Sequence, residues 1–465
     1  MTLLIGLDLG TTTITAALAD LERGDVLRVA RRRNDARLAT DLQTRAEQNP
    51  ARILALAIDA LAELAAAGDR VDGIALTGQM HGIVCVDAHS RPLTPLVTWQ
   101  DRRTSEPLPG SGTDLGHLRT RVADLDWRRN GCRIQHGYGA ATLFWWIKQQ
   151  ALPIGARRVC DVAGWIAARL AGLPPAIDPT FAASLGIYDV VDGTWNTSFV
   201  DRLGIDERLL PPVNPSGSRI GGLVPTLAHR VGLVAGLPVY NPVGDNQASF
   251  IGATMGMGSD GRAEGIESVM INLGTGGQVS WGVSRFDPPN EIVETRPLPG
   301  VGYLRVGASL CGGAAYAWLV HTVGAWLREF GVTVDREEVF EKLNMLAHTC
   351  PDPGSLRVRP TFLGVRGHPE IEEGAIEGIG LGALSLGTLA RATLIGIVDE
   401  LYDLYAAQGG GSSAASRLIA DGGAVRHNPL LVDLIKERFG LPTRLSNHPV
   451  PGAFGAVRLA ALHSV

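Results

Sequence analysis

Two stretches of the chain share one pattern, in which an apolar run leads into a turn rich in glycine and threonine. They are residues 3–13 (LLIGLDLGTTT) and residues 269–277 (VMINLGTGG), and a second apolar run follows each turn. The pattern predicts a strand, a tight turn and a second strand. The turn glycines Gly10 and Gly274 lie 264 residues apart (274 minus 10), which is too long for a solenoid repeat and indicates duplicated domains.

Helical periodicity extends this parallel between the two halves of the chain. Apolar residues recur at helical spacing over residues 53–64, after Asn49-Pro50, which is typical of a helix start. A second helix is expected over residues 386–404, and an apolar run that predicts a strand follows each helix, at 74–76 and 418–420. Alternating strands and helices favour an α/β fold. We expect an N-terminal domain over residues 1–247 and a C-terminal domain over residues 248–465.

The two turns have the chemistry of a phosphate site. Glycine lets the backbone approach an anion closely, so that successive N–H groups and threonine hydroxyls can point into one concavity. Asp8 lies just before the first turn and would repel a phosphate unless a cation such as Mg²⁺ lay between them. The pair of turns therefore predicts a nucleotide bound with its metal.

Composition excludes several other classes of protein. The net charge of -5 and the pI near 6.1 give no reason to expect a nucleic-acid partner. No apolar stretch approaches the ~20 residues of a membrane span, and the chain opens in a predicted strand, so we expect a cytoplasmic protein without a membrane partner. Five scattered cysteines predict reduced thiols. None of the few lysines follows a glycine, which excludes a Walker-type ATPase.

Asp245 is the candidate catalytic base. It follows the apolar run 237–243, and open α/β folds bind their ligands at the carboxyl ends of strands. A carboxylate there can accept the proton of a hydroxyl that attacks a phosphate. The alternative, from the same residues, is that Asp245 only caps the helix that follows it.

Polar and aromatic residues near predicted strand ends suggest a sugar site. Residues 78–82 (GQMHG) follow a strand directly, and residues 98–103 (TWQDRR) add an indole, a carboxylate and two arginines. This mixture suits a polyhydroxylated ligand, which needs polar partners and an apolar platform. Residues 144–146 (FWW) are interpreted as core. The candidate substrate-binding residues are Gln79, Met80, His81, Trp99, Asp101 and Tyr138.

Two further patterns are interpreted as loops. Residues 256–261 (GMGSDG) match a dinucleotide-binding pattern in form, yet they follow no convincing strand and open no periodic helix. His368, Glu370, Glu372 and Glu373 lack a fixed helical spacing, so we expect a solvated loop there rather than a metal site.

Together these motifs resemble the FGGY carbohydrate kinases, a family of the actin, heat-shock chaperone and sugar kinase superfamily, over nearly the whole chain. Residues 6–13 and 273–277 look like the family's two phosphate motifs, and residues 420–429 (ADGGAVRHNP) look like its adenosine motif. Residues 79–82 are shared with xylulokinase-like members. Residues 97–101 (VTWQD) and 137–142 (GYGAAT) look more like sedoheptulokinase.

The resemblance implies two actin-like (ribonuclease H-like) domains with an active site in the cleft between them. It also implies transfer of phosphate from ATP, with Mg²⁺, to a ketose, for which we expect D-sedoheptulose. Xylulose, another ketose or a polyol is the alternative substrate, and a sugar sensor without kinase activity is the alternative function. A homodimer is left open.

The resemblance further assigns roles to single residues. It makes Asp245 the base, places Asp8 at the metal through water, and adds Asn246 to the sugar site. His427 and Asn428 compete for the position that faces adenine. The nucleotide-binding residues that it implies are Gly10, Thr11, Thr12, Thr13, Gly274, Thr275, Gly276, Gly313, Gly422, Gly423, His427 and Asn428.

Overall fold

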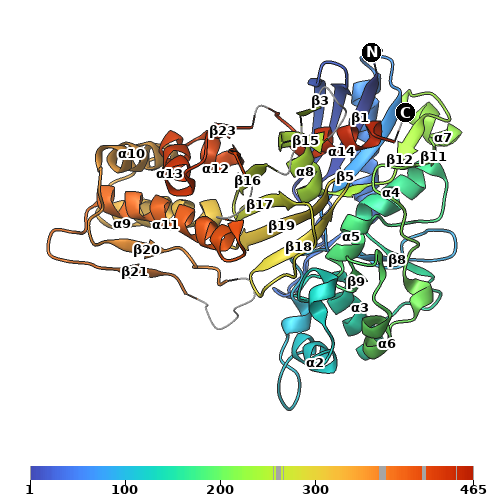
Figure 1. The fold of residues 1–465 in the computed structure, drawn as a ribbon, viewed down its shortest axis with the longest axis horizontal. Coiled ribbons are helices and arrows are strands. Elements are labelled where there is room, and N and C mark those ends of the chain that lie inside the picture. The colour runs from blue at the N-terminus through green and yellow to red at the C-terminus, as the bar shows by residue number, and fades with distance from the viewer. Residues whose placement is uncertain are drawn as a thin grey trace. The chain divides into compact units, whose positions relative to one another are not determined.

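The chain divides into two compact units in the computed structural model (Figure 1). Unit 1 comprises residues 1–255, 296–303 and 448–465, and unit 2 comprises residues 256–295 and 304–447. This division differs from the expected one at residue 247, because residues 248–255 and the C-terminal segment both belong to unit 1. The structure describes residues 2–254, 256–257, 263–264, 267–365, 373–410, 415–446 and 448–463.

The core of unit 1 is a seven-stranded sheet in the order β11-β12-β5-β1-β2-β3, with β13 also paired to β5. Strands β1 and β2 run antiparallel, with Asp8 opposite Thr15, which confirms the first predicted hairpin. Strand β5 runs parallel to β1. The strands are β1 (Leu3–Leu9), β2 (Thr13–Asp20), β3 (Asp25–Arg33), β5 (Gly73–Gly78), β11 (Arg219–Gly222), β12 (Pro238–Tyr240) and β13 (Val243–Gly244).

Several helices pack against this sheet or at its strand ends. Helix α1 (Pro50–Ala65) packs on β2 and β3, and the Asn49 side chain caps it by accepting hydrogen bonds from two N–H groups of the first turn, as predicted. Helices α8 (Asp245–Thr254) and α14 (Pro451–Ala461) pack on each other, and α14 also packs on β1 and β5 (Figure 1). This packing explains why the C-terminal segment belongs to unit 1.

The other elements of unit 1 are short. Three two-stranded sheets pair β4 with β7, β6 with β8, and β9 with β10. Their strands are β4 (Glu47–Gln48), β6 (Val84–Val86), β7 (Leu96–Val97), β8 (Arg158–Cys160), β9 (Tyr188–Asp189) and β10 (Thr194–Trp195). The helices are α2 (Asp114–Arg121), α3 (Gly139–Lys148), α4 (Val162–Ala171), α5 (Pro179–Ser184), α6 (Thr197–Leu203) and α7 (Pro225–Val231), with 3₁₀ turns η1 (Arg103–Ser105), η2 (Trp127–Asn130) and η3 (Glu207–Leu209).

Unit 2 is built around a six-stranded sheet in the order β18-β19-β17-β16-β22-β23, of which residues 296–303 of β18 and β19 are grouped with unit 1. Strand β16 runs antiparallel to β17 and parallel to β22. This is the arrangement of β1, β2 and β5, so the predicted duplication is confirmed at the level of strand topology. The strands are β16 (Ser268–Leu273), β17 (Gly277–Val283), β18 (Val293–Leu298), β19 (Gly302–Ser309), β22 (Arg417–Asp421) and β23 (Thr443–Leu445).

The helices of unit 2 carry its apolar core. The helix predicted over residues 386–404 is confirmed as α11, and the Ser385 side chain caps it. The helices are α9 (Gly312–Glu329), α10 (Arg336–Thr349), α11 (Leu386–Ala406), α12 (Gly423–Arg426) and α13 (Pro429–Phe439). Two short ribbons complete the unit, β14 (Gly256–Met257) with β15 (Ala263–Glu264) and β20 (Arg357–Arg359) with β21 (Ala375–Glu377).

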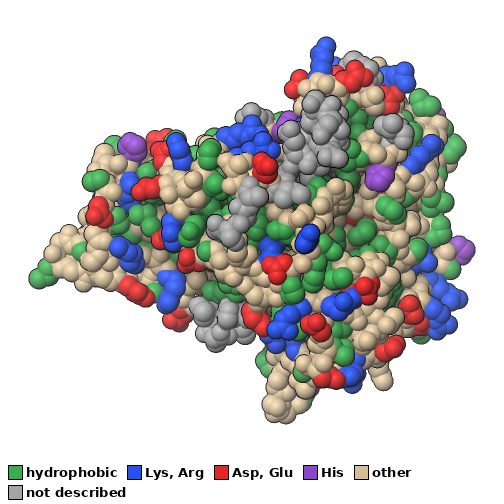
Figure 2. Space-filling view, in the orientation of Figure 1, with side chains coloured by type: hydrophobic (Ala, Val, Ile, Leu, Met, Phe, Trp, Pro, Cys, Tyr) green, Lys and Arg blue, Asp and Glu red, His purple; other side chains and the backbone are tan. Residues whose placement is uncertain are grey.

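Several smaller expectations have an outcome in the structure. All five cysteines are free thiols, as predicted. Phe144 and Trp146 are buried in α3, as the core interpretation requires, whereas Trp145 between them is only half-buried. Gly256 and Met257 form a short strand instead of a loop, whereas residues 258–261 and 368–372 lie outside the described residues. No helix within the described ranges has the length and apolar character needed to cross a membrane. Basic and acidic side chains are interspersed on the face shown in Figure 2.

Candidate active site

Two carboxylates of unit 1 lie at the ends of strands that flank β5 on either side. Asp8 on β1 is in register with Thr77 of β5, and Val243 of β13 is in register with the same residue from the other side. Asp245 follows β13 directly and opens α8. The sheet therefore brings Asp8 and Asp245 to one edge, although 237 positions of sequence (245 minus 8) separate them.

Burial and mutual repulsion shift the ionisation of both groups. Burial raises the pKa of Asp8 from 3.8 to about 6. Burial also raises the pKa of Asp245 to about 7, and the negative charge of Asp8 adds to this increase. A hydrogen bond with the backbone of Asn246 acts in the opposite direction. A carboxylate with a pKa near neutrality is well suited to accept a proton from a hydroxyl.

The turn between β1 and β2 is held by side chains from elsewhere in unit 1. Asn34 Nδ2 donates to the carbonyl oxygen of Gly10 (2.9 Å), and its backbone N–H donates to the carbonyl oxygen of Thr12 (2.9 Å). Gln48 Nε2 donates to the carbonyl oxygen of Thr11 (2.9 Å). Three successive carbonyl groups thus have partners within the protein. Thr13, the fourth predicted residue of this motif, begins β2.

The Thr11 hydroxyl links this turn to two predicted substrate-binding residues. It donates to Gln79 Oε1 (3.2 Å) and accepts a hydrogen bond from Trp99 Nε1 (3.0 Å). Gln79 is buried, and its Nε2 donates to Gln48 Oε1 (2.8 Å). The amide of Gln79 is therefore part of the support of the turn, whereas Trp99 is 40% exposed and offers an indole face to a ligand.

His81 and Tyr138 form a stacked aromatic pair. Their ring centroids are 4.2 Å apart and their planes differ by 14°. His81 has a positive φ of 71°, and its Nδ1 lies 2.8 Å from the carbonyl oxygen of Ser184. Because a carbonyl only accepts, Nδ1 carries the proton of this hydrogen bond, and Nε2 of a neutral ring is then an acceptor. Such an acceptor suits a sugar hydroxyl.

Arg296 contacts this aromatic pair through Tyr138. Its guanidinium is buried, donates to the Tyr138 hydroxyl (3.3 Å) and donates also to the carbonyl oxygen of Ala183. The guanidinium carbon lies 5.6 Å from the centre of the Tyr138 ring. Arg296 therefore holds the orientation of Tyr138 and, through it, of His81.

The three remaining substrate-binding predictions differ in their surroundings. Each carboxylate oxygen of Asp101 accepts two hydrogen bonds from within the protein, from Arg103 and from the N–H of Ala46, so a substrate hydroxyl would have to compete for it. Met80 is buried against Gly244, where a Cβ would lie 2.7 Å from Sδ. Asn246 lies in the first turn of α8, next to Asp245.

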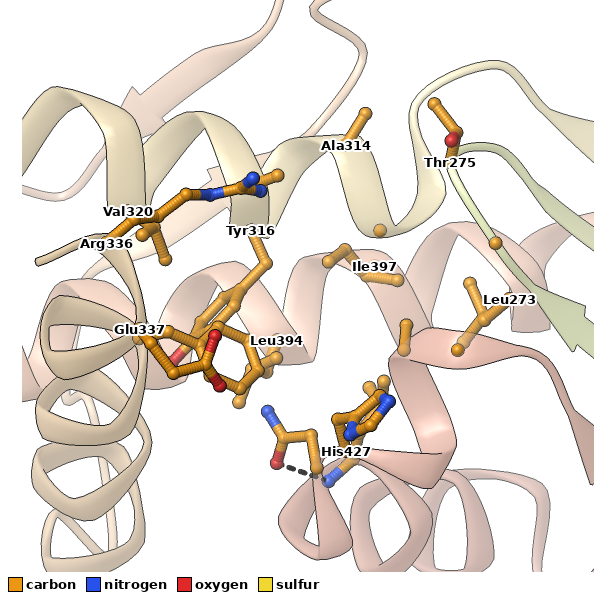
Figure 3. Close-up of a pocket in the computed structure, with 18 residues that line it drawn as sticks. Leu273, Thr275, Ala314, Tyr316, Val320, Arg336, Glu337, Leu394, Ile397 and His427 are labelled. Atoms are coloured by element: carbon orange, nitrogen blue, oxygen red, sulfur yellow. Dashed lines mark hydrogen bonds between the residues drawn. The ribbon is translucent and has the colours of Figure 1, made fainter.

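Unit 2 contains a cavity of about 520 Å³ that collects six of the twelve predicted nucleotide-binding residues (Figure 3). Gly274, Thr275, Gly313, Gly423, His427 and Asn428 line it. The backbone is tightly packed there, because a Cβ at Gly313 would lie 2.4 Å from the carbonyl oxygen of Gly274. Gly276 and Gly422 are not among the lining residues. Gly422 has a φ of 102°, a backbone conformation that favours glycine.

The two residues that compete for the adenine position differ in their hydrogen bonding. Asn428 Nδ2 donates to Asn344 Oδ1 (2.9 Å), and Asn428 Oδ1 caps α13 by accepting from the N–H of Leu431 (3.4 Å). The amide of Asn428 is thus engaged in structural contacts. The imidazole of His427 lies at the cavity wall (Figure 3).

Comparison with known proteins identifies the family. Residues 3–252 match the N-terminal domain of the FGGY family of carbohydrate kinases, and residues 270–464 match its C-terminal domain. The chain belongs to the FGGY family of carbohydrate kinases. It is therefore an enzyme, an ATP-dependent sugar kinase.

Individual relatives of this FGGY kinase span its whole length. It is 29% identical to sedoheptulokinase from Mus musculus over 97% of this chain and 96% of that one. It is 28% identical to glycerol kinase from Thermus brockianus over 95% and 86% of the two chains. The crystal structure of xylulose kinase from Rhodospirillum rubrum superposes with a TM-score of 0.85 at 25% identity, covering 100% of this chain and 90% of the other. The predicted fold of two actin-like domains is confirmed.

The acidic pair of the FGGY kinase fits a magnesium ion that is bound mainly by water and phosphate. Within the described part of the chain, no group of three or more His, Cys, Asp and Glu side chains could hold a metal. Mg²⁺ commonly takes one or two carboxylates and completes its shell with water and substrate phosphates. Asp8, whose pKa is raised by burial, is such a carboxylate, and a cation beside it would relieve its repulsion with Asp245.

Sequence reasoning missed several residues that shape these sites. Asn34 and Gln48 hold the first turn, Arg296 orients Tyr138, and Tyr316 and Glu337 line the cavity of unit 2. Arg296 and Tyr138 are 158 positions apart in sequence. No local pattern connects residues at such a distance, so only the fold reveals these contacts.

The pKa of Asp245 leads to a prediction for the pH dependence of the kinase. As the proposed catalytic base, Asp245 must be deprotonated, so we expect kcat/KM to fall about tenfold per pH unit as pH drops below about 7, the pKa of this group. An ordinary aspartate, with a pKa of 3.8, would keep its activity to about pH 5. Because a nearby cation lowers both carboxylate pKa values, raising the Mg²⁺ concentration should move the acid limb to lower pH. Rates from pH 5 to 9 at two Mg²⁺ concentrations test this, and a plateau that extends unchanged to pH 5 contradicts it.

Proposed function

We propose that this FGGY kinase transfers the γ-phosphate of ATP to the terminal hydroxyl of D-sedoheptulose and forms sedoheptulose 7-phosphate. The observation that carries the proposal is the placement of Trp99 and Tyr138. They come from the two segments that resemble sedoheptulokinase, and both are held in unit 1, the unit of Asp245, with an indole face exposed and a phenol ring stacked on His81. The identity of 29% to the mouse sedoheptulokinase supports the same substrate.

Each residue of the proposed site has one role. Asp245 accepts the proton of the sugar hydroxyl while the hydroxyl oxygen forms a bond to the γ-phosphorus, and the bond from this phosphorus to the bridging oxygen of ADP breaks. Mg²⁺ bound with ATP would neutralise phosphate charge, and Asp8 would hold it through water. Trp99, His81 and Asn246 would orient the sugar. The turn glycines and Thr275 would hold the phosphates of the nucleotide.

Xylulose, or another ketose or polyol, is the second candidate substrate. Gln79, Met80, His81 and Gly82 are shared with xylulokinase-like members, and the xylulose kinase from Rhodospirillum rubrum has a similar structure. A sugar sensor without kinase activity is less well supported, since a sensor needs neither Asp8 nor Asp245 with its pKa near neutrality.

A coupled assay of ADP release separates these proposals. The purified chain is supplied with Mg²⁺-ATP and, in turn, with sedoheptulose, xylulose, ribulose and glycerol. We expect the highest kcat/KM for sedoheptulose. A higher value for xylulose or glycerol would move the substrate to that compound and keep the mechanism. Absence of ADP release with every sugar, while ADP still binds, would favour the sensor.

A further inference from the structure

Helix α5 of unit 1 contacts both parts of the proposed site, the base and the aromatic pair that faces the sugar. All of its residues after Pro179 are buried. Two of them carry a hydroxyl group, Thr180 in the first turn and Ser184 at the last position. Buried hydroxyls nearly always have hydrogen-bond partners, so these partners show what the helix holds in place.

The Thr180 hydroxyl holds the end of the strand that precedes the base. Thr180 Oγ1 accepts a hydrogen bond from the backbone N–H of Gly244 (2.7 Å), and Asp245 is the next residue. The same hydroxyl donates its proton to Asp178 Oδ2 (2.7 Å). Its donor and one acceptor position are both used in this way. The contact fixes the backbone from which Asp245 begins α8.

Asp178 holds the Thr180 hydroxyl in this orientation. Its Oδ2 also accepts hydrogen bonds from the N–H of Thr180 (3.1 Å) and from the hydroxyl of Ser216, and its Oδ1 accepts from the N–H of Phe181 (2.9 Å). Asp178 and Ser216 are both buried. A chain of hydrogen bonds therefore runs from Asp178 through Thr180 to Gly244, the residue before the base.

Ser184, at the other end of α5, holds His81. Its Oγ accepts a hydrogen bond from the backbone N–H of His81 (3.1 Å) and donates to the carbonyl oxygen of Phe181 (2.7 Å). Its carbonyl oxygen accepts from His81 Nδ1 (2.8 Å). The φ of His81 is 71°, a conformation that costs energy for a residue with a side chain and persists where the surroundings enforce it. Ser184 thus holds both the backbone and the ring of His81.

The residue before Ser184 is tied to the other ring of the aromatic pair. The carbonyl oxygen of Ala183 accepts a hydrogen bond from Arg296, which also donates to the Tyr138 hydroxyl (3.3 Å). Tyr138 in turn stacks on His81. The contacts form a closed ring that leads from His81 through Ser184, Ala183, Arg296 and Tyr138 back to His81. Each member of such a network restricts the movement of the others.

We propose that α5 sets the spacing between the catalytic base and the sugar-binding pair, with Thr180 as a positioning residue for Asp245 and Ser184 as a positioning residue for His81. Each acts through the residue that it holds, and neither is assigned a contact with the reacting atoms. The helix has only six residues and is hydrogen-bonded to the site at both ends, so it keeps the two groups at one separation. The inference rests on the proposed function, which gives Asp245 the proton and His81 the sugar.

Steady-state kinetics of two variants test the proposal, with sedoheptulose or whichever other sugar of the ADP-release assay gives the highest kcat/KM. We expect Thr180→Val, which keeps the shape of the side chain, to lower kcat roughly 10-fold to 100-fold with little change in the sugar KM, since the base is displaced. Ser184→Ala should raise the sugar KM about threefold to tenfold and leave kcat near the wild-type value. A merely structural role would lower the melting temperature without this opposite change of kcat and KM.

Three further variants serve as controls. Thr180→Ser keeps the hydroxyl and should restore most of kcat. Thr393→Val removes an equally buried hydroxyl, which donates to the carbonyl oxygen of Leu389 within α11 (2.8 Å), and should have wild-type kinetics. Thr180→Val combined with Asp245→Asn should be no slower than Asp245→Asn alone, because a residue that acts through the base has no further effect once the base is removed.

Several results would overturn the proposal. A normal kcat in Thr180→Val, or a further loss of the same size in the Asp245→Asn background, removes Thr180 from positioning the base. An unchanged sugar KM in Ser184→Ala does the same for its link to His81. If Thr180→Val does not fold, Thr180→Ala removes the same hydroxyl and carries the same expectation. Failure of the proposed function is recognised separately, by near-normal turnover of Asp245→Asn alone.

Discussion

We expect Asp245→Asn to lower kcat by about 10²–10⁴-fold, because asparagine keeps the shape of aspartate but cannot accept the proton of the attacking hydroxyl. The carboxylate lies at the end of β13, and its pKa is about 7, which matches its proposed task near neutral pH. Binding of ADP and of the sugar should change little, since the substitution leaves the fold of the sheet edge intact. The measurement is steady-state turnover together with calorimetric binding of both ligands.

A matched substitution separates the role of the base from a general effect of charge. Asp59 lies on the exposed side of α1, and Asp59→Asn should have the turnover of the wild type. If Asp245→Asn also turns over at a near-normal rate, Asp245 only caps α8 and another group is the base. If it fails to bind ADP and shows a lower melting temperature, the loss of activity reflects misfolding. Turnover per correctly folded molecule is therefore the quantity to compare.

Gly455→Ala should destabilise unit 1 strongly and remove activity with it. A Cβ at Gly455 of α14 would lie 1.8 Å from the carbonyl oxygen of Ala248 in α8. The two helices are equally close on the other side of this contact, where a Cβ at Gly252 of α8 would lie 2.0 Å from the carbonyl oxygen of Pro451. Backbone atoms cannot yield as side-chain ends do, so we expect a loss of about 3 kcal/mol, at the upper end of typical overpacking. For a unit of this size the melting temperature should fall by roughly 6–12 °C.

Activity should be lost because helices α8 and α14 adjoin the two carboxylates of the candidate site. Helix α8 begins at Asp245, and a Cβ at Gly452, in the first turn of α14, would lie 3.0 Å from Asp8 Oδ2. Separating the helices would displace both carboxylates of the candidate site. Thermal unfolding and turnover of the same preparation measure the two effects together.

Gly324→Ala in α9 makes the same change where there is room. The nearest atom to a Cβ at Gly324 is Nη1 of Arg328, 3.6 Å away at the end of a flexible side chain. Removing glycine from a helix interior contributes up to about 1 kcal/mol, so this variant should melt at the wild-type temperature or above. A Gly455→Ala variant as stable as Gly324→Ala would show that α8 and α14 do not need this close approach.

Local patterns of the sequence were sufficient to predict those elements whose structure depends on neighbouring residues. The hairpin around Gly10, the hairpin around Gly274 and helix α11 follow from apolar periodicity and from turn residues, which act over a few positions. Asp245 could be picked out for a similar reason, since a carboxylate that directly follows a short apolar strand is visible in the sequence. The family resemblance also rests on such short motifs.

The sequence by itself thus determined the α/β class, the duplicated hairpins and the carboxylate proposed as the base, because short-range patterns encode each of them. Only the tertiary structure decided which side chains support them. The hydrogen bonds of Thr11 with Gln79 and Trp99 span 68 and 88 positions, and those of Arg296 with Tyr138 span 158. It also placed α14 with unit 1. Such contacts depend on how strands and helices pack, and packing joins residues that no local pattern connects.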